Sequence, residues 1–157
     1  MSQQLIIYTD GAARGNPGPG GYGAILQWGT TTKELSQGYR HTTNNRMELM
    51  AVIAALHNLN RDNIEIAIYS DSAYVVNAVE KGWLFGWAKK GFAGKKNKDL
   101  WAIFLTHYKR HRIKFVWVKG HADNPYNNRC DVLATMAADS GNWLIDEGYE
   151  NGMAEGV

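Results

Sequence analysis

Apolar segments suited to β-strands change their mode of connection part-way along this chain. The first three are joined by short links rich in Gly, Pro and Thr, which are typical of antiparallel neighbours. The last two are separated by amphipathic helical segments, and such crossovers place strands parallel to one another. The expected strands cover residues 5–9, 22–28, 33–39, 64–69 and 113–118, and the expected helices cover 45–59, 72–81, 98–110 and 127–139. We therefore expect an α/β fold with a five-stranded mixed sheet flanked by helices, with strands 1–3 antiparallel and strands 4 and 5 parallel to strand 1.

Length and composition indicate one domain. The chain has 157 residues, 45% of them hydrophobic, and no apolar run approaches the roughly 20 residues needed to span a membrane. We expect residues 1–140 to form the domain and the acidic, Gly-rich residues 141–157 to be a loose tail. Cys130 is the only cysteine, so no internal disulfide can form and a reducing, cytoplasmic compartment is expected. We expect a monomer with no membrane contact and no small-molecule cofactor.

Positive charge is concentrated in one segment. Residues 81–119 contain eleven Lys and Arg side chains and a single acid, for a net charge of +10, whereas the rest of the chain carries −8. Such segregation indicates a polyanionic partner. Residues 82–94 are expected to form an irregular excursion, in which Trp83 and Trp87 lie among the bases and can stack on sugars or bases. The alternative is a solvated basic face with some Trp side chains in the core.

Residues 18–23 match the pattern G-x-G-x-x-G, but the context is wrong for a dinucleotide site. Such a site needs a helix directly after the glycines, because the helix N-terminus binds the pyrophosphate. The residues that follow, 24–28, are strand-like. We interpret residues 11–23 as a loop between antiparallel strands and exclude a nucleotide cofactor.

Four acids occupy unusual positions. Asp10 and Asp71 each follow an apolar strand, and parallel neighbours would bring both to the same carboxyl edge of the sheet. Glu48 and Asp131 each share a helix face with apolar residues, so both are expected to face the sheet. The sequence therefore predicts that the four carboxylates converge on one region.

Three of the four acids, Glu48, Asp71 and Asp131, also have a purely structural interpretation. Asn45 and Glu48 have the spacing of a capping box, and Asp71 could cap the helix that follows it. Asp131 could be a first-turn acid favoured by the helix dipole. These interpretations do not account for Asp10, nor for the convergence of all four.

A cluster of carboxylates must bind cations or hold protons, because two unit charges about 4 Å apart repel by roughly 4 kcal/mol at an effective dielectric of 20. Oxygen ligands without Cys or His at metal spacing favour Mg²⁺, with Mn²⁺ as a substitute. Beside a basic surface, such ions indicate phosphoryl chemistry on a nucleic acid, and two ions about 4 Å apart can assist an in-line displacement.

One histidine stands out from the other four. His121 lies on a Gly-flanked loop expected to border the same sheet edge, where it could move protons near neutral pH. The other four are expected to be exposed surface residues: His41, His57, His107 and His111.

Several motifs, in order from about residue 5 to residue 139, resemble those of bacterial type 1 ribonuclease H. They are Thr9-Asp10-Gly11, residues 15–24, residues 42–49, Asp71-Ser72, Val118-Lys119-Gly120-His121-Ala122 and residues 127–131. The resemblance implies a ribonuclease H-like fold and an endonuclease that cleaves the RNA strand of an RNA–DNA hybrid. The products would carry 5′-phosphate and 3′-hydroxyl ends.

The resemblance also implies roles for individual residues. It makes Asp10, Glu48, Asp71 and Asp131 the metal-binding catalytic carboxylates and His121 a mobile proton-transfer group. It places Asn16, Asn44 and Asn45 in the minor groove and Thr43 in a pocket for a DNA-strand phosphate. It makes residues 81–98 a basic protrusion that grips the DNA strand, with the side chains Trp83, Trp87, Lys89, Lys90, Lys95 and Lys96.

Two residues depart from the family pattern: Ala73 stands where Gln is frequent and Asn124 where a second His is frequent. They affect the expected affinity and the loop's proton behaviour, not the reaction. The alternatives are another nuclease or resolvase of the same architecture and a non-catalytic module that binds hybrids.

Overall fold

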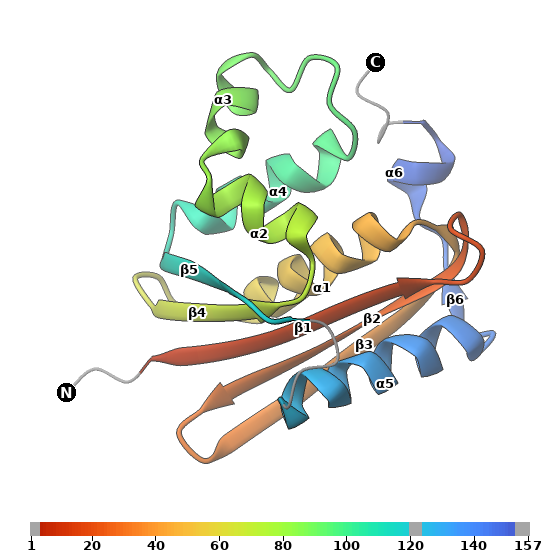
Figure 1. The fold of residues 1–157 in the computed structure, drawn as a ribbon, viewed down its shortest axis with the longest axis horizontal. Helices are drawn as coiled ribbons and strands as arrows, with labels where there is room; N and C mark the ends of the chain where they lie inside the picture. The colour runs from red at the N-terminus through yellow and green to blue at the C-terminus, as the bar shows by residue number, and fades with distance from the viewer. Residues whose placement is uncertain (1–3, 120–123, 153–157) are drawn as a thin grey trace.

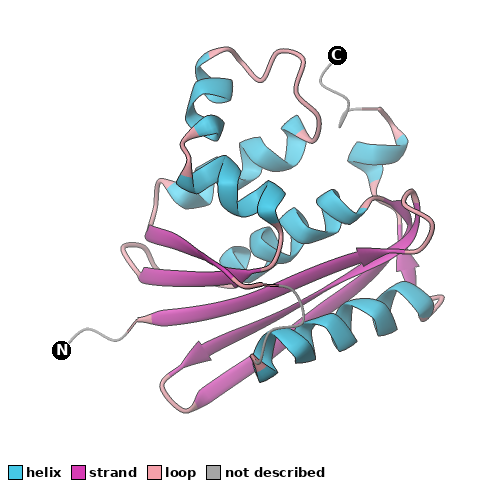
Figure 2. Cartoon of the chain, viewed as in Figure 1, coloured by secondary structure: helices cyan, strands magenta, loops and turns pink. Residues whose placement is uncertain are grey.

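The computed structural model describes residues 4–119 and 124–152, which form a mixed sheet with helices on both faces (Figures 1 and 2). The strands are β1 (Leu5–Ala13), β2 (Gly18–Trp28), β3 (Thr31–Thr42), β4 (Glu65–Ser70), β5 (Arg112–Trp117) and β6 (Trp143–Leu144). The helices are α1 (Asn44–His57), α2 (Ala73–Glu80), α3 (Trp83–Lys89), α4 (Lys98–Tyr108), α5 (Pro125–Asp139) and α6 (Glu147–Glu150).

The strand order is β5-β4-β1-β2-β3-β6. Strands β1 to β3 are antiparallel, and β4 and β5 run parallel to β1, as predicted. The expectation of five strands was wrong by one, because β6 pairs in parallel with β3. The two residues of β6 are too few to give a strand pattern in the sequence.

Helices α1 to α4 lie on one side of the sheet, and α5 lies on the other (Figure 1). The main core fills the first side and includes the fully buried Ile7, Leu49, Ile68, Trp101 and Phe104. A smaller cluster lies under α5, where Tyr8 stacks between Tyr69 and Tyr126 at ring-centroid distances of 5.3 and 4.7 Å. The sheet is therefore held rigidly from both sides.

The glycine-rich segment is mostly strand and not the predicted loop over residues 11–23. Strand β1 continues to Ala13 and β2 begins at Gly18. A Cβ at Gly21 would lie 2.5 Å from the carbonyl oxygen of Ala134, and one at Gly23 would lie 2.5 Å from that of Cys130. The glycines allow the backbone of α5 to approach the sheet, a tertiary requirement that turn statistics do not capture. The G-x-G-x-x-G pattern of residues 18–23 thus lies within β2 and not in the predicted connecting loop, and strand continues after it to Trp28.

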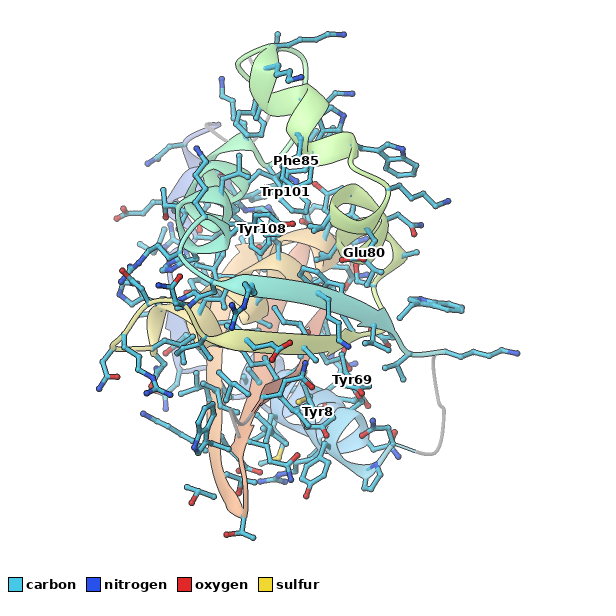
Figure 3. All side chains as sticks on the ribbon, turned by 90° about the vertical axis from the view of Figure 1, so that its left-hand side faces the viewer. Tyr8, Tyr69, Glu80, Phe85, Trp101 and Tyr108 are labelled. Atoms are coloured by element: carbon cyan, nitrogen blue, oxygen red, sulfur yellow. The ribbon has the colours of Figure 1, made fainter. Side chains whose placement is uncertain are left out.

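The basic excursion is helical where an irregular chain was predicted. Gly82 directly precedes helix α3 and has a φ of +77°, in the left-handed region of backbone conformation. Leu84 is fully buried, and Phe85 contacts Tyr108 at 5.3 Å between ring centroids (Figure 3). Trp87 packs edge-on against Trp101 at 6.0 Å. These apolar contacts supply the burial that a short helix needs for stability.

Two of the four histidines expected on the surface are buried. His107 is 7% exposed and His111 is 9% exposed, whereas His41 and His57 are exposed. The Nδ1 atom of His111 accepts a hydrogen bond from the backbone of Ile64, and burial lowers the pKa of both buried histidines. His107 lies on α4 and His111 on the link from α4 to β5, and the packing of these two segments buries both side chains. The sequence pattern does not indicate this packing.

The expected loose tail is ordered over residues 141–152. Asp146 is 3% exposed and receives two hydrogen bonds of 2.8 Å from the buried Arg46. The Nη1 and Nη2 atoms of Arg46 also donate hydrogen bonds of 2.9 and 2.8 Å to the two carboxylate oxygens of Asp99. Thr42 donates a further 2.7 Å hydrogen bond to Asp146. One buried arginine thus joins α1, α4 and the C-terminal segment.

The variant Asp146→Asn should lower the free energy of unfolding by about 2–4 kcal/mol, because it leaves the buried Arg46 with one carboxylate in place of two. Urea unfolding followed by circular dichroism measures the change. The matched control is Asp139→Asn, which removes an exposed pair with Arg14 and should hardly change stability, since surface ion pairs contribute little. Equal stability of Asp146→Asn and wild type would contradict the role of this cluster.

Candidate active site

Three carboxylates predicted from the sequence meet at one edge of the sheet. Strands β1 and β4 are parallel with Tyr8 opposite Tyr69, so Asp10 and Asp71, each two residues further on, emerge together. Glu48 comes from the second turn of α1. Each of the three offers an oxygen, and these oxygens all lie within 4.8 Å of one another. The spacing suits shared coordination of a cation.

Gly11 allows Glu48 to reach this position. A Cβ at residue 11 would lie 2.4 Å from the backbone nitrogen of Glu48 and from the carbonyl carbon of Met47. Real Cβ atoms do not approach backbone atoms so closely, so only glycine lets α1 pack this tightly against β1. The glycine after Asp10 is therefore a requirement of the site.

The N-caps of α1, α2 and α5 are residues other than those suggested by the sequence. The helix-capping and first-turn interpretations of Glu48, Asp71 and Asp131 are therefore wrong. Thr43 caps α1 by accepting a hydrogen bond from the backbone of Arg46, and Ser72 caps α2 by accepting one from Val75. Asn124 caps α5, so Asp131 lies in the second turn and not in the first. Neither Asn45 nor Asp71 serves as an N-cap side chain.

The site stores unfavourable electrostatic energy. Burial raises the pKa of Asp10 to about 7, and the charges of Asp71 and Asp131 add to this increase. Burial raises the pKa of Glu48 further above its usual range, and the charges of Asp10 and Asp71 act in the same direction. Without a cation, burial and the neighbouring negative charges thus favour the protonated forms of these two groups.

The residues fit a divalent cation. The donors are all carboxylate oxygens, which Mg²⁺ and Mn²⁺ prefer. Among the described residues, the Glu48 Oε2 atom is one of few buried side-chain oxygens without a hydrogen-bond partner. A buried carboxylate oxygen without a partner is costly, and metal coordination would satisfy it.

Two predicted catalytic residues are not part of this group. Asp131 is exposed on α5 and lies outside the three-carboxylate cluster, although its charge raises the pKa of Asp10. His121 lies outside the described residues. The convergence expected for four acids is therefore observed for three.

Five of the ten residues predicted to contact substrate line a pocket of about 410 Å³ beside the start of α1. Its lining includes Asn16, Thr43, Asn44, Asn45 and Lys96. Asn44 accepts a 2.6 Å hydrogen bond from the backbone of Ala13, and its own backbone donates one of 3.0 Å to Asn16. These bonds tie the pocket to β1, the strand that carries Asp10.

The pocket also has lining residues that the sequence reasoning missed, Asn97 and Tyr149. Asn97 is 7% exposed and adopts a φ of +61° just before α4. Tyr149 belongs to the segment expected to be loose. The tolerance of Asn for positive φ is a weak signal for a special backbone position, and nothing in the sequence pattern singles out Tyr149.

The remaining predicted contacts lie on or beside α3. Trp83 is 48% exposed, with the Lys81 ammonium over its ring, and Lys89 and Lys90 are exposed. Trp87 is half-buried against Trp101, with Lys95 over its ring at 5.1 Å. Trp87 therefore serves the core as well as the basic surface, so the two interpretations of this segment both hold in part.

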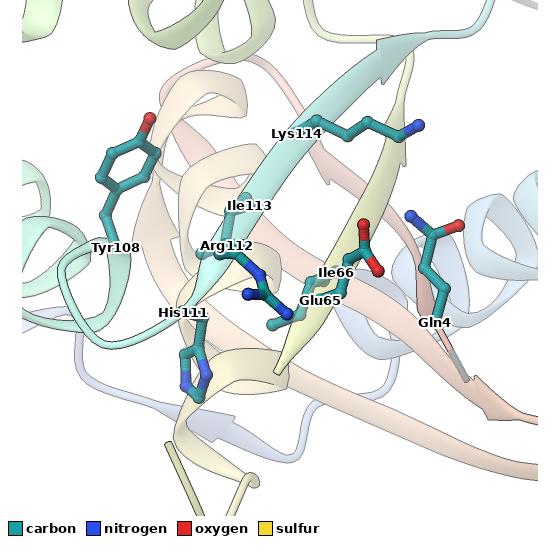
Figure 4. Close-up of a pocket in the computed structure, with 8 residues that line it drawn as sticks. All are labelled: Gln4, Glu65, Ile66, Tyr108, His111, Arg112, Ile113 and Lys114. Carbon is teal, nitrogen blue, oxygen red and sulfur yellow. The ribbon is translucent and has the colours of Figure 1, made fainter. Parts of the chain in front are cut away.

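A second hollow, of about 280 Å³, lies between β4, β5 and the residues just before each (Figure 4). Its lining includes Glu65, His111, Arg112 and Lys114 and contains none of the predicted site residues. It opens at the starts of the parallel strands, opposite the edge that carries Asp10 and Asp71. Among the described residues, the predicted site residues and this hollow thus lie at different places on the sheet.

The carboxylate cluster, the amide-lined pocket and the basic protrusion are compatible with metal-dependent phosphoryl chemistry on a nucleic acid. Residues 2–139 match the family model described as RNase H. The chain belongs to the ribonuclease H family, whose members are nucleases of the hydrolase class.

Curated relatives agree over nearly the whole chain. The ribonuclease H of Syntrophus aciditrophicus (strain SB) is 52% identical over 152 residues, covering 94% of this chain and 87% of the relative. That of Lachnoclostridium phytofermentans is 52% identical over 158 residues, covering 94% and 99%. These relatives support the bacterial resemblance drawn from the motifs.

Solved structures support the same fold. LC9-RNase H1, a type 1 RNase H with the type 2 active-site motif, superposes with a TM-score of 0.77 at 28% identity, covering 98% of this chain and 82% of its own. LC11-RNase H1, solved in complex with an RNA/DNA hybrid, has a TM-score of 0.67 at 28% identity, covering 88% and 99%. The predicted ribonuclease H-like fold is confirmed.

Within the described part of the chain, no helix has both the length and the apolar character needed to cross a membrane.

The variant Asp10→Asn should be more stable than wild type at pH 8 in EDTA, by about 2–4 kcal/mol. The folded protein raises the pKa of Asp10 from 3.8 to about 7, so the unfolded state releases this proton at lower pH than the folded state. The associated stability is present below about pH 4 and is lost as pH rises through about 7. Urea unfolding at pH 4 and pH 8 measures it.

Asp62→Asn is the matched control, because Asp62 is exposed and pairs with Arg110 at the surface. It should change stability only slightly at either pH value, since exposed ion pairs contribute little. An Asp10→Asn protein no more stable than wild type at pH 8 would show that Asp10 is not strained by its surroundings.

Proposed function

We propose that this chain hydrolyses the RNA strand of RNA–DNA hybrids and leaves 5′-phosphate and 3′-hydroxyl ends. The observation that carries the proposal is the meeting of Asp10, Glu48 and Asp71 oxygens within 4.8 Å. Asp131 is the proposed fourth carboxylate, because its charge already acts on Asp10. Mg²⁺ is the proposed metal, with Mn²⁺ as a substitute.

Asp10, Glu48 and Asp71 would hold the metal, with Asp131 reaching it from α5. A pair of bound divalent ions would activate water and neutralise charge on the leaving oxygen. The chain's own carboxylates place that chemistry at a fixed point, because two are buried and β1, β4 and α1 hold their backbones. Metal binding would also favour the ionised forms of Asp10 and Glu48, against the burial that raises the pKa of each.

Substrate choice would follow from duplex shape. A hybrid has a wide, shallow minor groove with 2′-hydroxyls on one strand. Asn16, Asn44 and Asn45 are short amides that can contact sugars and base edges there with little sequence discrimination. Thr43 would contribute to holding a DNA-strand phosphate, and the protrusion over residues 81–98 would hold the rest of that strand through Trp83, Trp87 and the lysines.

We further propose that His121 moves protons during turnover. A monomer and a cytoplasmic location complete the proposal. The cytoplasmic location rests on Cys130, because a chain with a single cysteine forms no internal disulfide.

The variants Asp10→Asn and Asp71→Asn should abolish cleavage of a labelled hybrid while leaving hybrid binding largely intact. Each removes a metal-binding charge but keeps the shape of the site. Gel-resolved cleavage in Mg²⁺ and fluorescence anisotropy in EDTA measure the two properties. The control is Asp62→Asn, which should behave as wild type.

The same assay separates the alternatives. Equal cutting of a DNA duplex by wild type would indicate another nuclease or resolvase of this architecture. Binding of the hybrid without any Mg²⁺-dependent cleavage by wild type would indicate a non-catalytic binding module. Retained turnover in either variant would contradict the assigned carboxylate roles.

Replacing Lys89, Lys90, Lys95 and Lys96 with Ala should raise the KM for the hybrid more than it lowers kcat. These side chains contact the substrate away from the reacting phosphate, so they contribute equally to ground-state and transition-state binding. Steady-state kinetics at two salt concentrations measures the effect. A loss confined to kcat would contradict the grip assigned to the protrusion.

A further inference from the structure

We propose that the C-terminal segment is part of the substrate-binding surface and that Tyr149 on α6 contacts a sugar–phosphate unit of the bound nucleic acid. This inference rests on the proposed function but concerns a residue that the motifs do not reach. The structural observation is that Tyr149 lines the same pocket of about 410 Å³ as Thr43, Asn44 and Lys96.

The pocket suits a phosphodiester with its sugar. Its lining offers side-chain amides, the hydroxyls of Thr43 and Tyr149 and the ammonium of Lys96, and no carboxylate is among the described residues that line it. Neutral hydrogen-bond donors around a single cation match the single negative charge of a phosphodiester. The half-buried ring of Tyr149 adds a flat apolar wall, which suits the face of a sugar.

Buried contacts hold Tyr149 in place. Asp146 caps the turn that carries it and accepts a 3.3 Å hydrogen bond from the Tyr149 backbone. The ring of Tyr149 lies 5.4 Å from that of His41, centroid to centroid. Gly148 packs onto the buried cluster so closely that a Cβ there would lie 2.0 Å from an Asp99 oxygen and 2.6 Å from an Arg46 nitrogen.

Arg46 organises the pocket and does not itself bind the phosphate. Its guanidinium nitrogens donate to Asp99 and Asp146, and Nη1 also donates a 3.3 Å bond to Asn97. The side chain is 1% exposed. Hydrogen bonds to the two aspartates outweigh the effect of burial and raise the pKa of Arg46. Among the described residues that line the pocket, Lys96 is thus the cation available to a phosphate.

The pocket is built on the elements that carry the carboxylates. Thr43 caps α1, the helix of Glu48, and Asn44 bonds to Ala13 on β1, the strand of Asp10. A sugar–phosphate held between Thr43, Lys96 and Tyr149 would therefore fix the position of the duplex relative to the three carboxylates. The ordered tail would add affinity without entering the chemistry.

The test compares Tyr149→Ala, Tyr149→Phe, Lys96→Ala and the matched control Asn151→Ala, which changes an exposed residue at the end of the same helix. Hybrid binding is measured by fluorescence anisotropy in EDTA and cleavage by steady-state kinetics in Mg²⁺, with circular dichroism melting curves to check folding. Tyr149→Ala should raise both Kd and KM about three- to tenfold, as expected for losing one aromatic contact, with kcat within twofold of wild type. Tyr149→Phe should lose less, because it keeps the ring.

Salt dependence separates the two contact types. Lys96→Ala should reduce the slope of log K against log salt by about one, whereas Tyr149→Ala should weaken binding without changing it, because tyrosine carries no charge. Unchanged Kd in Tyr149→Ala, or an equal rise in the control Asn151→Ala, would overturn the proposal. Weaker hybrid binding by Tyr149→Ala in a protein whose wild type fails to cleave would support the contact and overturn the proposed function alone.

Discussion

The close approach of α1 to β1 is the constraint on which the rest of the site depends. It brings the Glu48 carboxylate beside that of Asp10, where burial and like charge oppose ionisation of both. Gly11 makes the approach sterically permissible, and Thr43 sets where α1 begins. The fold thus holds unfavourable charges together at a defined place, and a divalent cation is the partner that relieves them.

A second organising contact is the buried guanidinium of Arg46. It binds the start of α4 through Asp99 and the C-terminal segment through Asp146, so three segments distant in sequence share one hydrogen-bond network. Buried ion pairs specify position more reliably than they add stability. Here the position specified is that of the pocket wall, which links the tail to the surface around Thr43 and Lys96.

The basic protrusion combines two properties that were treated as alternatives. Its aromatic side chains anchor it, since Leu84 and Phe85 contact the core and Trp87 packs on Trp101. Its lysines remain outside, and two of them lie over tryptophan rings. An anchored helix with a charged outer surface can present cations to a polyanion at lower entropic cost than a mobile loop.

The sequence by itself determined the strand directions, the edge where Asp10 and Asp71 emerge and the participation of Glu48, because connection lengths and apolar periodicity are local signals. Only the tertiary structure decided the sixth strand, the helical protrusion, the burial of His107 and His111 and the order of the tail. Each of these depends on contacts between distant segments, such as Asp146 with Arg46 or α5 with the β2 glycines. Local sequence patterns do not predict such contacts. A short polar or glycine-rich segment has no fixed structure by itself and becomes ordered only when a distant residue packs against it.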